Sequence, residues 1–85
     1  MNICFLIGKV ISEIEFKFII EGKDVAVITF YIELENKSIL KVKGYNEIAD
    51  ECYQKLKIGD TIAIQGILNN KGEIKIQDEI EIIQW

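Results

Sequence analysis

The sequence has 85 residues, 49% of them hydrophobic and 28% charged, which is the composition of one small folded domain and excludes a disordered chain. Its basic residues are ten lysines against 14 acidic residues, and the resulting net charge of −4 excludes the broad basic surface typical of nucleic-acid-binding proteins. Histidine is absent and the two cysteines form no zinc-binding pattern, so we expect a non-enzymatic protein without metal or cofactor.

The N-terminal part predicts one long, curved first strand. Residues 1–11 are apolar on both faces apart from Lys9. Charged residues then alternate with Ile14, Phe16 and Phe18, which predicts one wet face and one dry face. A turn is expected at the glycine that follows.

Two further strands are predicted at residues 25–34 and 38–45, joined by a short hairpin loop. Alternation in the second strand places four apolar residues on one side: Ala26, Ile28, Phe30 and Ile32. If the dry face of the third strand continues the same core, Leu40 and Val42 point inward. Its outward residues are then Ile39, Lys41, Lys43 and Tyr45.

Residues 46–58 predict the one helix of the chain. The apolar residues that recur every fourth position are Ile48, Cys52 and Leu56. Asn46 is placed to cap the start of this helix, and Gly59 to close its end.

Strands four and five are predicted at residues 61–68 and 73–83, joined by a hairpin turn at 69–72. The order is β-β-β-α-β-β, with the helix between strands three and four, where the OB fold has the helix that closes one end of its barrel. We therefore expect an all-β chain with one helix, folded as a five-stranded OB-fold barrel in a single domain over residues 1–85.

Four segments carry motifs in a recognisable order. They are Asn2, Leu6 and Gly8 with Glu15-Phe16-Lys17-Phe18; Gly22, Val25, Ala26, Ile28, Thr29 and Phe30; Tyr45-Asn46-Glu47-Ile48-Ala49-Asp50; and Leu56, Gly59, Ile62, Ile64, Gln65, Gly66 and Leu68. In this order and at nearly ungapped spacing they resemble the OB domain of bacterial single-stranded DNA-binding proteins, from residue 2 to about residue 83. The resemblance implies this fold and binding of single-stranded DNA.

Some family features are missing from this sequence. The resemblance implies base-stacking aromatic platforms, of which only Tyr45 remains, because the other positions fall near Asn36, at Ile39 and around Glu73. The chain has no arginine, its last hairpin loop is short, and the acidic C-terminal tail of the family is not found.

Candidate nucleic-acid-binding residues are aromatic, hydroxyl and lysine side chains on the outer faces of the predicted strands. They are Tyr45, Lys41, Lys43, Tyr31, Thr29, Lys17, Lys71 and Lys75. The Tyr45 ring either stacks a base or packs over the start of the helix. The lysines either follow phosphates or keep an exposed sheet face in solution, and for Lys71 and Lys75 ordinary turn charges are the favoured interpretation.

The first strand predicts self-association. Ile3, Phe5 and Ile7 lie on one side and Cys4 and Leu6 on the other, so a small barrel leaves one apolar side to cover. Strand pairing between identical copies closes with two-fold symmetry. We expect a homodimer or homotetramer through these residues, with Trp85 as a further contact.

The resulting prediction is a non-catalytic module that binds single-stranded DNA, or RNA, weakly and without sequence preference, in replication, recombination or repair. The alternative is an OB-fold protein-protein assembly module that has lost DNA binding. The apolar run at residues 3–7 is too short for a signal peptide, and no membrane span is present. Two isolated cysteines in apolar patterns predict free, buried thiols in a cytoplasmic protein.

Overall fold

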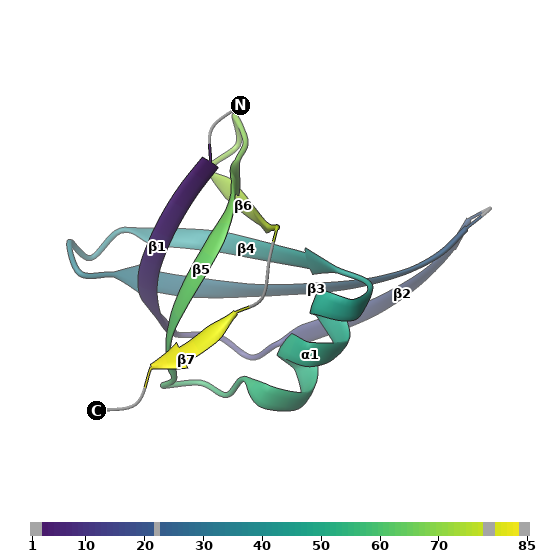
Figure 1. The fold of residues 1–85 in the computed structure, drawn as a ribbon, viewed down its shortest axis with the longest axis horizontal. Helices are drawn as coiled ribbons and strands as arrows, with labels where there is room; N and C mark the ends of the chain where they lie inside the picture. Colours follow the sequence, from purple (N-terminus) through teal and green to yellow (C-terminus); the bar gives the residue numbers. More distant parts are fainter. Residues whose placement is uncertain (1–2, 22, 78–79, 84–85) are drawn as a thin grey trace.

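Seven strands and one helix make up the computed structural model, which describes residues 3–21, 23–77 and 80–83 (Figure 1). In chain order they are β1 (Ile3–Val10), β2 (Glu15–Glu21), β3 (Lys23–Leu34), β4 (Ile39–Tyr45), α1 (Glu47–Lys55), β5 (Thr61–Leu68), β6 (Glu73–Ile76) and β7 (Glu81–Ile83).

Five of these strands close the barrel. They follow one another in the order β1-β3-β4-β6-β5, and antiparallel pairing of β1 with β5 completes the circuit. The other barrel pairs are antiparallel too, except that β6 runs parallel to β4. The predicted five-stranded OB-fold barrel with β-β-β-α-β-β order is therefore confirmed.

The core follows the alternation that the sequence predicted. Ile28, Phe30 and Ile32 of β3 are at most 1% exposed, and Val42 of β4 is fully buried beside them. The helix α1 packs on the same cluster through Cys52, which is fully buried. Because only every second residue of these strands points inward, the outer faces are left for other contacts.

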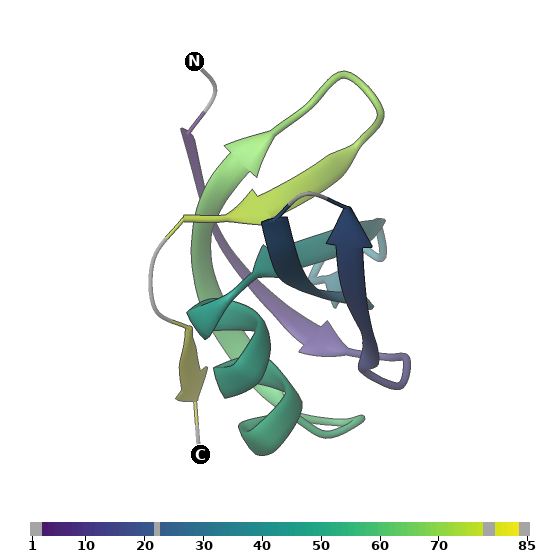
Figure 2. The ribbon, with the colours of Figure 1, turned by 90° about the vertical axis from the view of Figure 1, so that its right-hand side faces the viewer.

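The prediction of one continuous first strand is wrong, since β1 and β2 are separated by residues 11–14. There the Ser12 hydroxyl oxygen accepts a hydrogen bond from the Tyr31 backbone N–H at 2.8 Å, in place of a strand carbonyl. After this break, β2 and the first half of β3 extend away from the barrel as a hairpin arm (Figure 1), which points towards the viewer in Figure 2. Phe18 lies on this arm and is 57% exposed, so its predicted burial is also wrong.

The helix is shorter than predicted, and its ends are formed differently. Asn46 makes no side-chain cap; its backbone N–H donates to the Ala26 carbonyl at 2.8 Å, which ties the helix start to β3. The helix ends at Lys55 because Leu56 returns to extended backbone. Gly59 lies beyond this end, with a φ of 99° in the turn before β5.

The predicted last strand is divided into β6 and β7. Both pair with β5, β6 along Gly66–Leu68 and β7 along Thr61–Ala63. Strand β5 therefore pairs with both C-terminal strands. Residues 78 and 79, between these two strands, lie outside the described residues.

Candidate nucleic-acid interface

The outer sides of β3, β4 and β6 form one continuous surface. In the strand register Thr29 lies beside Lys43 and Lys43 beside Lys75, while Tyr31 lies beside Lys41 and Lys41 beside Glu73. Tyr45 follows at the end of β4. We call this surface the lysine-tyrosine face, made of Thr29, Tyr31, Lys41, Lys43, Tyr45, Glu73 and Lys75.

The buried side chains of these strands determine which residues point outward on this face. Phe30, Val42 and Ile74 are at most 1% exposed, and each stands between two residues of the face along its own strand. A shift of one residue in any of the three strands would expose its core side chain to water and bury residues of the face, so the register is strongly specified. The predicted common placement of Thr29, Tyr31, Lys41, Lys43 and Tyr45 is confirmed.

A carboxylate pairs with two of the lysines. Glu73 Oε2 lies 3.6 Å from Lys41 Nζ and 3.7 Å from Lys43 Nζ. Glu73 Oε1 accepts a hydrogen bond from the Asn69 side-chain amide at 3.0 Å. That hydrogen bond lowers the pKa of Glu73 below its ordinary value, and Lys43 and Lys41 act in the same direction.

Lys75 is placed against the aromatic residue of the same face. Its Nζ stands 5.1 Å from the centroid of the Tyr45 ring, within the range of a cation–π contact. The ring is half-buried, so part of it remains accessible beside the ammonium group. This contact was not visible from the sequence, since it joins β4 to β6.

The remaining predicted lysines lie at the margins. Lys17 stands opposite Val27 on the outer side of the hairpin arm, and Val27 stands opposite Tyr45, so Lys17 extends the face by one strand. Lys71 belongs to the turn between β5 and β6, where its N–H donates to Asn69 Oδ1 at 2.8 Å. Lys71 is therefore at a hairpin tip outside the sheet surface.

A second exposed surface lies on β1 and is apolar. Ile3, Phe5 and Ile7 are 56%, 68% and 53% exposed, and we call them the β1 strip. Cys4 and Leu6, which are also predicted in an interface, are half-buried and pack against the core, and their interface role stays a prediction. The β1 strip is thus the uncovered side of the first strand, and Trp85 lies outside the described residues.

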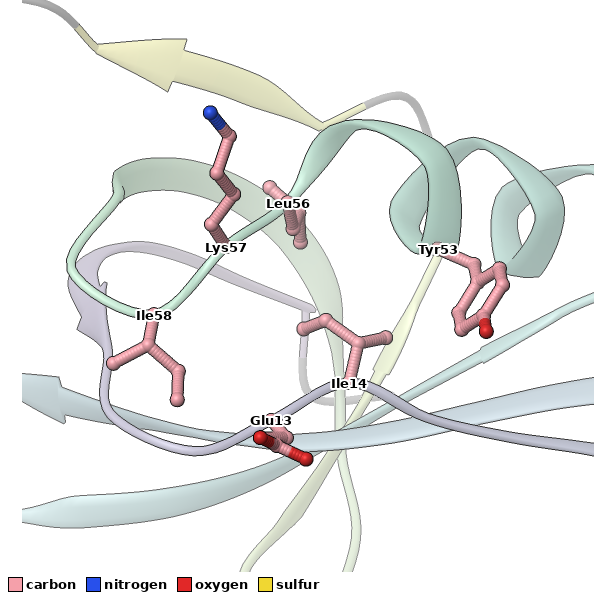
Figure 3. A pocket seen from close by; sticks show the side chains of 6 residues that line it. All are labelled: Glu13, Ile14, Tyr53, Leu56, Lys57 and Ile58. Atoms are coloured by element: carbon pink, nitrogen blue, oxygen red, sulfur yellow. The ribbon is translucent and has the colours of Figure 1, made fainter.

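An open groove of about 630 Å³ separates the segment after β1 from the end of α1 (Figure 3). Its lining residues are Glu13, Ile14, Tyr53, Leu56, Lys57 and Ile58, none of which was predicted as a site residue. The Tyr53 ring also packs on Phe16 at 5.1 Å between centroids. One acid and one lysine on apolar walls form no catalytic arrangement.

Both cysteines are free thiols, as predicted, but the predicted burial holds only for Cys52, since Cys4 is half-buried. Cys52 is buried beneath the helix, and burial raises its pKa to about 12, with Glu51 adding to the shift. Among residues 3–21, 23–77 and 80–83, no group of three His, Cys, Asp or Glu side chains could hold a metal ion. Within the same ranges no helix has the length and apolarity needed to cross a membrane.

No protein-family model matches the chain, and no curated protein sequence matches it significantly. Among solved structures it is similar to the SSB domain of a Synechococcus sp. protein, at 20% identity and a TM-score of 0.83 over 95% of this chain and 94% of that one. The single-stranded DNA-binding protein of Thermus aquaticus aligns at 19% identity with a TM-score of 0.80, over 100% of this chain and 41% of that one. The chain thus spans about two fifths of that protein.

A third similar structure is the dimeric N-terminal domain of PriB from Thermoanaerobacter tencongensis. It aligns at 19% identity with a TM-score of 0.67, over 99% of this chain and 98% of that domain. These alignments cover the whole barrel, so the agreement extends beyond single motifs. The chain therefore has the OB fold of the bacterial single-stranded DNA-binding domains that its sequence resembles.

Proposed function

We propose that this chain is a non-catalytic OB module, spanning residues 1–85, that binds single-stranded nucleic acid weakly and without sequence preference in replication, recombination or repair. The observation that carries the proposal is the lysine-tyrosine face. There two tyrosines and three lysines from β3, β4 and β6 lie on one surface. Sequence-independent binding of single strands uses this combination, because rings stack bases of any kind and lysines follow the backbone.

The expected binding is weak for three reasons. Tyr45 is the one aromatic platform that the family resemblance retains, and a stacked base contributes about 1 to 3 kcal/mol. Lys41 and Lys43 are already paired with Glu73, so phosphates gain less from them than from unpaired lysines. A net charge of −4 gives no long-range attraction for a polyanion.

Fluorescence anisotropy with a labelled oligo(dT) tests this proposal. We expect binding at low salt that weakens steeply as salt is added. For about four lysines the log-log salt slope should be no steeper than about −3, from roughly −0.7 per phosphate neutralised on single strands. Parallel titration with oligo(rU) compares RNA with DNA. No binding at low salt with several hundred micromolar protein would contradict the proposal.

The β1 strip supports a second proposal, self-association. Three large apolar side chains side by side on a barrel strand favour burial against another chain. Pairing with an identical copy is self-complementary under two-fold symmetry, and the similar PriB domain is a dimer. We therefore propose a homodimer, through the β1 strip, in either functional setting.

An assembly module without nucleic-acid binding is the alternative function, supported by the β1 strip together with the neutralised lysines. The same anisotropy series separates the two. Oligonucleotide binding that is measurably weakened in a Lys41→Gln/Lys43→Gln variant supports the nucleic-acid module. A stable dimer or a co-purified protein partner without any oligonucleotide binding supports the assembly module. The cytoplasmic location inferred from the cysteines stays a prediction.

A further inference from the structure

Glu73 lies on β6 at one side of the lysine-tyrosine face, beside Lys41 of β4, and is held by three side chains. One carboxylate oxygen contacts Lys41 and Lys43 at 3.6 and 3.7 Å, and the other accepts the hydrogen bond from Asn69 at 3.0 Å. The side chain is only 18% exposed, about half the exposure of either lysine side chain. The carboxylate is therefore placed between the two ammonium groups rather than extended into solvent.

The position of this carboxylate is set by the hairpin turn. Asn69 Oδ1 accepts hydrogen bonds from the backbone N–H groups of Lys71 at 2.8 Å and Glu73 at 3.0 Å, which fixes the side-chain amide. The same amide then donates to Glu73 through its nitrogen. The backbone of the turn thus orients the Glu73 carboxylate through the Asn69 side chain, and this contact restricts the rotamers of Glu73.

Every lysine of the face consequently has a partner within the chain. Lys41 and Lys43 share the Glu73 carboxylate, and the ammonium group of Lys75 stands over the Tyr45 ring. Glu73 Oε2 is thus one negatively charged oxygen shared by two ammonium groups, and a non-bridging oxygen of a backbone phosphate would provide the same contact. The acid therefore occupies the position that a phosphate needs.

We propose that Glu73 is an internal phosphate mimic, which holds Lys41 and Lys43 while the face is empty and is displaced from them by a phosphate of the bound strand. The inference rests on the proposed function and names Glu73 as the residue that sets the affinity and the salt dependence of nucleic-acid binding. The exchange replaces one oxyanion by another, so it yields little free energy by itself. A ligand with several phosphates and stackable bases is favoured over a single phosphate ion.

The direct test is Glu73→Gln, which keeps the shape of the side chain and an oxygen for the Asn69 hydrogen bond. Oligo(dT) anisotropy should show affinity about three- to tenfold higher at low salt, in line with the modest strength of partly exposed ion pairs. The salt slope should become steeper by roughly 0.7, for one additional charge neutralised by the strand. Glu81→Gln on β7 is the matched control, because it changes net charge equally away from the face; its affinity should stay within about twofold of the wild type.

A second variant distinguishes displacement of Glu73 from the lysines from general repulsion between Glu73 and the phosphates. In a Lys41→Gln/Lys43→Gln variant, Glu73→Gln should give no gain, because no lysine is left to release. A gain that persists there would show that Glu73 acts only as a nearby negative charge, and would overturn the mimic. Wild-type binding with no gain in Glu73→Gln would overturn it and leave the proposed function standing. No binding by either protein would contradict the proposed function and the mimic with it.

Discussion

The lysine-tyrosine face and the β1 strip are two outer surfaces of one barrel, and they differ in how their side chains are satisfied. On the first, Lys41, Lys43 and Lys75 each have a partner within the chain. On the second, Ile3, Phe5 and Ile7 are each more than half exposed. The first surface is complete without a ligand, whereas the second leaves apolar area in water.

This difference indicates two kinds of binding. A ligand on the lysine-tyrosine face must replace contacts that already exist, so weak, salt-sensitive and reversible binding follows. A partner on the β1 strip removes apolar area from water, and full burial contributes about 1.5 to 3 kcal/mol for each large side chain. The strip is therefore suited to a lasting interface, and the polar face to a transient one.

The largest effect is expected for Phe5→Glu, which places a charge in the centre of the β1 strip. Burying an unpaired carboxylate is unfavourable, so the dimer should dissociate. Light scattering at micromolar concentration should show the mass falling from about twice 9.8 kDa to a single chain. Phe18→Glu is the matched control, since Phe18 is 57% exposed on the hairpin arm, and it should leave the dimer intact. A wild-type mass of one chain, or a Phe5→Glu dimer, would contradict the proposed interface.

Gly66→Ala should disturb the lysine-tyrosine face more than the β1 strip. A Cβ at this position of β5 would collide with the Lys75 carbonyl oxygen and would lie 2.7 Å from Ile74 Cγ2, so β6 must shift. We expect a loss of about 1 to 3 kcal/mol in unfolding free energy, the usual cost of overpacking. Urea denaturation measures this loss, and anisotropy measures the accompanying loss of oligonucleotide binding. Unchanged stability would show that the strands separate without strain.

Tyr45→Ala tests whether the aromatic ring of the polar face stacks a base. We expect oligo(dT) binding to weaken by about 1 to 3 kcal/mol while the melting temperature stays within a few degrees. Tyr53→Ala, which removes an exposed ring from α1, should leave binding unchanged. A lower melting temperature without loss of binding would show instead that Tyr45 only packs over the helix start.

The smallest effect at neutral pH concerns the Cys52 thiol on the inner side of α1. Because the pKa of Cys52 is raised to about 12 from 9.0, the folded protein keeps this proton where the unfolded chain loses it. Stability should be unaffected by this group below pH 9 and should fall as the pH rises from about 9 towards 12. At neutral pH Cys52 should not react with a thiol reagent until the protein is unfolded. Rapid reaction of both thiols in the native protein would contradict this burial.

Much of the fold follows from local alternation in the sequence. Strand β5 and the hairpin turn before β6 lie where the pattern places them, and Ala26, Ile28, Phe30 and Ile32 are all buried as predicted. Alternation also put Lys41, Lys43 and Tyr45 on one side of β4, because successive side chains point to opposite faces of a strand.

Features that depend on distant segments could not be predicted in this way. The break between β1 and β2 depends on the hydrogen bond from Tyr31 to Ser12, and both residues are unremarkable in their own segments. The ion pairs of Glu73 depend on parallel pairing of β4 with β6, which are far apart in the chain. The alternation of residues along one strand does not indicate which other strand pairs with it.

The most direct test of nucleic-acid binding by the polar face is an NMR titration of the ¹⁵N-labelled protein with unlabelled oligo(dT). Amide signals of the polar face should move with increasing oligonucleotide, namely those of Thr29, Tyr31, Lys43 and Tyr45, while the signals of Ile3, Phe5 and Ile7 should remain in place. Signals that move mainly on the β1 strip, or no movement at low salt, would contradict the assignment of the lysine-tyrosine face as the binding surface.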